Sequence, residues 1–178
     1  MRRAHLISGF ALVGILITSP VLGQNSPTDY RDAFLGHFEQ SSHKITELAR
    51  VMPEEKYTWA PGEGLMTVAQ VYAHLARYNF MYLDQNLGIS PPGGLEYMGL
   101  EEMTDKDEVR EVFELSVSHV KAKVAAMTEV ALSDKTNLYG QQVSGWTVLL
   151  QLISHMNEHV GQSVAYARMN GIVPPWSR

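Results

Sequence analysis

The sequence predicts an all-α domain, a four-helix bundle, and three observations favour this class. Four long stretches repeat apolar residues at spacings of three and four, as the buried face of a helix requires. No stretch shows the alternation of polar and apolar residues that is typical of a half-buried strand. Clusters of proline and glycine separate the stretches. The chain has 178 residues, 45% of them hydrophobic and 19% charged, which suits one domain with a substantial core.

The first two helices can be placed from their apolar positions and their ends. We expect the first helix at residues 27–51, because apolar residues recur there at helical spacing until Pro53 prevents its continuation. The second helix begins after Thr67, which forms a capping-box pattern with Gln70, and its apolar stripe continues to Tyr82. The segment "LGISPPGGLEYMGLEEM" then predicts a long, irregular connection.

The third and fourth helices carry comparable signals. We expect Thr104 to cap the third helix, whose apolar positions run from Val109 to Met127. We expect Ser144 to cap the fourth helix, and Gly171 suits the left-handed residue that ends it. Four amphipathic helices in one chain can bury their apolar faces by packing on one another, which is the reason for predicting a bundle.

The N-terminal 23 residues have the layout of a secretory signal peptide. A basic start, "MRR", precedes a short apolar run, and the small residue Gly23 suits the position before a cleavage site. The run is shorter than the roughly 20 apolar residues that span a bilayer. We therefore expect residues 1–23 to be removed, which leaves a domain at residues 24–178 without a membrane span, periplasmic or secreted. The alternative is an uncleaved N-terminal anchor.

Composition excludes several kinds of site. The chain has no cysteine, which excludes disulfides, thiolate metal ligands and a cysteine nucleophile. The formal net charge is −5, and no basic block is present, so we expect no nucleic-acid partner. Loss of residues 1–23 would remove two arginines and no acidic residue, which takes the net charge to −7.

Two histidines near the C-terminus are the first candidates for a functional site. In "HMNEHVGQ", His155 and His159 are four residues apart, so both rings project from the same face of the fourth helix. They flank its central apolar stripe and are expected at the edge of the core. That stripe consists of Trp146, Leu149, Ile153, Met156, Val160, Val164 and Ala167.

Two imidazoles are too few for a complete metal site, so a third ligand is needed. His74 is the best candidate, because it lies on the inward half of the second helix, whereas His43 and His119 sit at the edges of their stripes. Neutral imidazole suits zinc, nickel, copper and iron. The alternative is that these are ordinary core histidines with both ring nitrogens hydrogen-bonded.

Glu158 makes "HMNEH" a formal match to the inverted zinc-protease motif H-x-x-E-H. The helical wheel places Glu158 on the solvent side, about 60° from His155, which argues against the protease interpretation. Glu158 remains the candidate for a catalytic role, orienting a ligand or transferring a proton.

The same residues resemble the DinB/YfiT-like superfamily of small four-helix proteins. The resemblance rests on "MPEEKYTWAPGEGLMTVAQVYAHLARYN" and "HMNEHVGQSVAYARMNGIVPPW", and it covers nearly all of residues 28–176. It implies an up-down-down-up bundle with a long crossover between the second and third helices. It also implies a divalent metal ion, zinc or nickel first among them, held by His74, His155 and His159, and it suggests a homodimer.

Three functions follow as hypotheses. The first is a metal-dependent enzyme, a hydrolase or an S-transferase, acting on a small molecule that the sequence does not identify. Export disfavours transfer of the cytosolic thiols that transferases in this family use. The second is a non-catalytic bundle that binds a metal or small ligand, and the third is a structural bundle whose histidines are inert.

Overall fold

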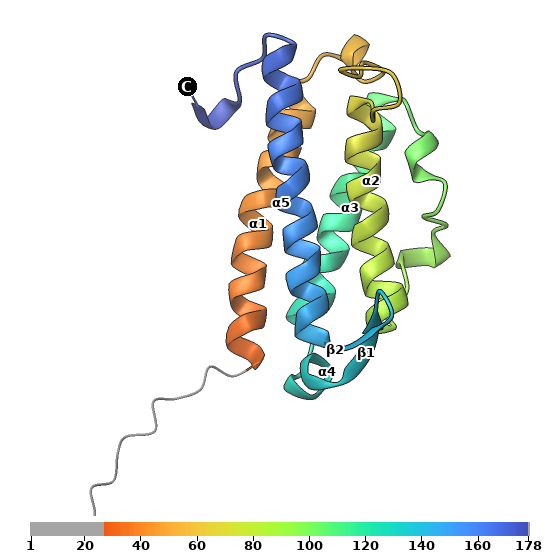
Figure 1. Cartoon of the computed structure of the whole chain (residues 1–178), viewed down its shortest axis with the longest axis vertical. Helices are drawn as coiled ribbons and strands as arrows, with labels where there is room; N and C mark the ends of the chain where they lie inside the picture. Colours follow the sequence, from red (N-terminus) through yellow and green to blue (C-terminus); the bar gives the residue numbers. More distant parts are fainter. Residues whose placement is uncertain (1–26, 178) are drawn as a thin grey trace, which may run out of the picture.

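Four long helices lie alongside one another (Figure 1). The computed structural model describes residues 27–177, so the signal peptide expected at residues 1–23 lies outside the described part of the chain. The long helices are α1 (Pro27–Val51), α2 (Val68–Met81), α3 (Lys106–Ala125) and α5 (Gly145–Met169). The short elements are α4 (Glu129–Ser133), β1 (Lys135–Leu138), β2 (Gln141–Ser144), the π-helix η2 (Tyr82–Asn86), and the 3-10 turns η1 (Glu54–Lys56), η3 (Pro92–Gly94), η4 (Leu100–Glu102) and η5 (Pro175–Ser177).

The small sheet corrects the all-α prediction. Strands β1 and β2 form an antiparallel hairpin in which Lys135 pairs with Ser144 and Leu138 with Gln141. Its two turn residues, Tyr139 and Gly140, have φ angles of 52° and 81°, the positive values that suit two-residue hairpin turns. Each strand has only four residues, and only Leu138 is buried, so neither strand contains enough apolar positions to show alternation.

Three of the four predicted helix starts are confirmed by the structure, and the fourth is wrong. Thr67 and Gln70 form the expected capping box at the start of α2, and Ser144 is the N-cap residue of α5. At α3 the prediction of Thr104 was wrong by one residue. Asp105 is the N-cap there, and its carboxylate accepts hydrogen bonds from two backbone N–H groups. The ends of α1 match the predicted range.

The core lies between the four long helices, with α2 packed closely on α3 and α1 on α5. The apolar stripe of α5 is rotated relative to the prediction. Trp146 is 37% exposed, whereas Val148 and Leu152 are buried. The buried face of α5 therefore includes the flank that carries the paired histidines, and this rotation brings both imidazoles into the bundle.

The connection between α2 and α3 runs back along the outside of the bundle (Figure 1). The π-helix η2 first continues α2, and the later turn η4 packs against α2. This return places the residues of η4 beside the middle of α2, one turn beyond the capping box. Within residues 27–177, no helix combines the length and apolar character that a membrane crossing requires.

Candidate metal centre

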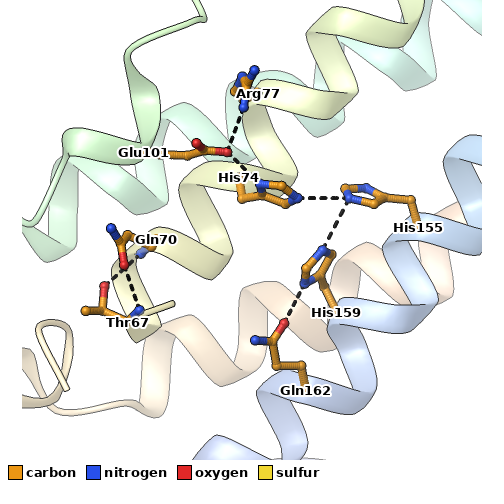
Figure 2. Close-up of polar contacts among 8 residues, drawn as sticks. All are labelled: Thr67, Gln70, His74, Arg77, Glu101, His155, His159 and Gln162. Carbon is orange, nitrogen blue, oxygen red and sulfur yellow. Dashed lines mark hydrogen bonds and ion pairs between the residues drawn. The ribbon is translucent and has the colours of Figure 1, made fainter. Parts of the chain in front are cut away.

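Three histidines from two helices meet between α2 and α5 (Figure 2). His74 projects from α2, while His155 and His159 project from successive turns of α5. The Nε2 atom of His155 lies 3.1 Å from Nε2 of His74 and 3.2 Å from Nε2 of His159. One ring nitrogen from each residue lies within 4.8 Å of the others. The three residues that the sequence singled out are thus neighbours in space.

The spacing of these nitrogens suits a common metal ion. At a zinc–nitrogen distance of about 2.0–2.1 Å, two imidazole ligands in tetrahedral geometry have nitrogens roughly 3.3 Å apart. The observed separations of 3.1 and 3.2 Å are close to that value. All three side chains are partly buried, which limits competition by water. The donor set, three neutral nitrogens, also fits nickel, copper and iron.

Two of the three rings are held by polar partners on the side away from the centre. His74 donates from Nδ1 to Oε1 of Glu101, at 2.5 Å, and Arg77 donates to the same oxygen at 3.0 Å. His159 donates from Nδ1 to Oε1 of Gln162, at 2.6 Å. Figure 2 shows both partners on the outer side of the cluster. Each contact leaves the Nε2 lone pair directed at the centre.

The electrostatics keep the α5 histidines neutral. Burial, together with the nearby His159 and His74, lowers the pKa of His155 to about 3. Burial also lowers the pKa of His159, although Gln162 acts in the opposite direction. At neutral pH both rings are therefore unprotonated, which is the form that binds a metal ion.

Tyrosine rings line one side of the cluster. The ring of Tyr78 lies 4.4 Å from that of His74 and 4.6 Å from that of His155, measured between centroids. Tyr82 lies edge-on to His155 at 6.0 Å. The Tyr82 hydroxyl is 2.6 Å from that of Tyr139, which stands at the tip of the hairpin. The hairpin therefore contacts the aromatic side of the site.

The other residues considered from the sequence lie elsewhere. His119 is buried on α3 against Phe80, and His43 is exposed on α1. Glu158 is exposed and, among the described residues, makes no hydrogen bond or ion pair. Its proposed catalytic role stays a prediction.

Glu101 and Gln162 are the site residues that the sequence reasoning missed. Gln162 could have been found, because it follows His159 by three residues and such pairs are neighbours on a helix. Glu101 carried no such signal. It is 27 residues from His74 and lies in a connection whose path the sequence does not define.

The comparisons with known proteins agree with this architecture. A family model described as the DinB superfamily matches residues 37–163, and the chain belongs to that superfamily. Its fold is similar to a crystal structure of a DinB-like protein from Bacillus cereus ATCC 10987, with a TM-score of 0.69, 19% identity, and coverage of 81% of this chain and 95% of that one. A DinB-like protein, YjoA, from Bacillus subtilis gives a TM-score of 0.63, 20% identity and coverage of 79% and 93%. Among curated proteins, none matches.

Proposed function

We propose that His74, His155 and His159 hold a divalent metal ion, zinc or nickel, in a metal-dependent enzyme of the hydrolase or transferase type that acts on a small molecule. One observation supports the proposal above the others: the Nε2 atoms of three histidines from two helices face one point at ligand spacing. When bound, a divalent ion with three histidine ligands and an open position supplies Lewis acidity and lowers the pKa of a coordinated water.

The surrounding residues have distinct roles in this proposal. The rings of Tyr78 and Tyr82 pack against the histidines and exclude water from that side of the centre. Glu158, which is one residue before His159 and exposed, is placed to exchange protons with solvent.

The first test is elemental analysis of untagged protein, for which we expect about one equivalent of a divalent metal per chain. Protein purified without metal should regain one equivalent on addition of zinc or nickel, and its melting temperature should rise because the ligand binds only the folded state. Activity should then be sought with a panel of esters, amides, lactones and thiol–electrophile pairs. Wild-type protein that neither contains nor takes up metal would end the proposal.

A non-catalytic metal-binding bundle is the second candidate. It is favoured by one observation: the carboxylate in contact with the cluster, Glu101, is already engaged by His74 and Arg77, and Glu158 is exposed. No other carboxylate in the described part of the chain is hydrogen-bonded to the histidines. Stoichiometric metal without turnover across the panel would support this candidate over the enzyme.

Three further expectations belong to the same proposal. The long return between η2 and α3 supports an up-down-down-up order of the long helices. The signal-like N-terminus supports export, which fractionation of cells expressing the full chain would test.

The resemblance supports a homodimer. An apolar groove between α1 and α5, lined by Tyr30, Trp146 and Leu150, offers a surface for a second copy. Light scattering of wild-type and Leu150→Glu protein would test the dimer.

A further inference from the structure

A histidine can bind a metal through Nε2 only when its proton is on Nδ1. In solution both neutral tautomers are populated, so a protein that needs the Nε2 lone pair must favour one of them. The tautomer is set by the hydrogen bond of the other ring nitrogen. The partners of His74 and His159 on their outer sides therefore decide which nitrogen faces the centre.

At His74 the partner can only accept. Glu101 lies 2.5 Å from Nδ1, and a carboxylate has no proton to donate when ionised. Arg77, 3.0 Å from the same oxygen, fixes the carboxylate. This contact requires the Nδ1–H tautomer of His74.

At His159 the partner is the side-chain amide of Gln162, and either its oxygen or its nitrogen could face the ring. A series of hydrogen bonds decides which of the two atoms does. The series begins at the backbone carbonyl of Met66, which only accepts and receives the Tyr166 hydroxyl proton at 3.1 Å. The Tyr166 oxygen is then left to accept from the Gln162 amide nitrogen, at 3.0 Å. The Gln162 carbonyl oxygen must therefore face Nδ1 of His159, at 2.6 Å. This contact also requires the Nδ1–H tautomer.

We propose that Glu101 and the Gln162–Tyr166 pair are positioning residues that fix His74 and His159 as Nδ1–H tautomers and direct both Nε2 lone pairs to one point. His155 differs, because no hydrogen bond to its Nδ1 atom is found among the described residues. Two ligands are thus oriented by the protein, and the third is free to adjust. The consequence for metal affinity rests on the proposed function, but the assignment of tautomers does not.

The two positioning contacts are chemically unequal. Glu101 is charged and Gln162 neutral, so Glu101 increases the basicity of its histidine more. Loss of such a partner costs about 10- to 100-fold in metal affinity. We expect the loss of metal affinity in Glu101→Gln to lie in this range. Tyr166→Phe, which touches neither a ligand nor the centre, should act through Gln162 alone and weaken binding by less.

The decisive measurement is nitrogen–proton correlation NMR of the histidine rings in metal-free protein. Wild-type protein should show Nδ1–H tautomers at His74 and His159. Glu101→Ala, which removes the acceptor, should shift the tautomer equilibrium of His74 and leave His159 unchanged, and Tyr166→Phe should do the reverse. Glu102→Ala, at the exposed neighbouring position, is the matched control and should change neither ring. Nε2–H tautomers in wild-type protein, or variants that leave both rings unchanged, would overturn the inference.

A zinc competition titration of the same variants separates this inference from the proposed function. Tautomers as expected in a wild-type protein that binds no zinc would leave the positioning roles intact and reject the metal centre. Zinc binding of equal affinity in wild-type and Glu101→Ala protein would keep the metal centre and reject the positioning role. Gln162→Glu keeps an acceptor at His159 and should retain its tautomer, which guards against a variant that simply misfolds.

Discussion

Two contacts between helices in this bundle contain buried or partly buried histidines, and they differ in what surrounds the rings. Between α2 and α3, His119 is only 7% exposed and packs against Phe80 with its ring centroid 5.7 Å away. Between α2 and α5, the rings of His74, His155 and His159 pack against one another with centroids 4.7–5.1 Å apart. Burial lowers the pKa of His119 just as it lowers that of His155.

The difference lies in the polar partners. The Nε2 atom of His119 is buried without a hydrogen bond among the described residues. In the α2–α5 contact, by comparison, each Nε2 atom faces another nitrogen, and two of the Nδ1 atoms have acceptors. Burial and a lowered pKa therefore do not distinguish a core histidine from a ligand. Convergence of lone pairs, with partners that orient them, does.

The largest expected effect removes two of the three converging rings. His155→Ala/His159→Ala should weaken zinc binding by at least about 1,000-fold, because each ligand supplies a share of the roughly 10–16 kcal/mol that a full zinc site provides. Competition titration with a chromophoric chelator measures the change. His119→Ala is the control on the other contact and should bind zinc as the wild type does. Equal losses of zinc affinity in both variants would show that convergence of lone pairs does not distinguish a ligand from a core histidine in this bundle.

A second effect concerns acid stability of the metal-free protein. The folded-state pKa of His155 is about 3, well below the value of about 6.5 for an unfolded chain, so the unfolded state takes up a proton first as the pH falls. Stability should be complete above about pH 6.5 and decline below it. Between pH 7 and pH 5 we expect a loss of about 1–2 kcal/mol from this ring, after allowing for screening by water.

Urea denaturation in the presence of EDTA at the two pH values measures this loss. His155→Gln should show a smaller decline than the wild type, while His159 and His119, whose pKa values are also lowered, continue to contribute. An unchanged decline in His155→Gln would mean that folding does not lower the pKa of His155.

The parts of this molecule that could be predicted from the sequence are those set by local chemistry. The capping box at Thr67 depends on two side chains three residues apart, and the pairing of His155 with His159 depends on helical spacing. Helical periodicity also placed His74 on an inward face. Each of these requires only the geometry of one helix.

The parts that could not be predicted depend on contacts between distant segments. The rotation of α5 that buries Val148 instead of Trp146 is set by how α1 and α5 pack, which a wheel does not contain. Glu101 reaches His74 only because an irregular connection returns along α2. The β1–β2 hairpin is held by the polar contacts of Thr136 and Asn137 with Asn86, and such contacts leave no periodic signal.

A smaller effect should come from the α2–α3 contact itself. Replacing His119 by leucine removes a buried nitrogen that has no partner, and such a group costs about 1–3 kcal/mol. After allowance for imperfect packing of the new side chain, we expect His119→Leu to raise the free energy of unfolding by up to about 1 kcal/mol. Urea denaturation at neutral pH measures the change.

Asn79→Leu is a matched control in the same contact. Asn79 is also buried, but its amide donates to Ser116, 2.9 Å away, so the substitution removes a satisfied hydrogen bond. It should lower stability by about 1 kcal/mol. A loss of stability in His119→Leu comparable to that in Asn79→Leu would show that His119 has an unrecognised partner.

The smallest expected effect on the metal centre comes from Glu158. Glu158→Gln and Glu101→Gln make the same chemical change at two glutamates, one exposed and one in contact with His74. We expect Glu158→Gln to change zinc affinity by less than about twofold and stability by less than about 0.5 kcal/mol. If Glu158 transfers protons, turnover of any substrate found should still fall by about 100-fold or more. A loss of zinc affinity equal to that of Glu101→Gln would instead mean that the exposed carboxylate turns inward to the bound metal. Glu158 would then belong to the interior face of α5 and not to its solvent face.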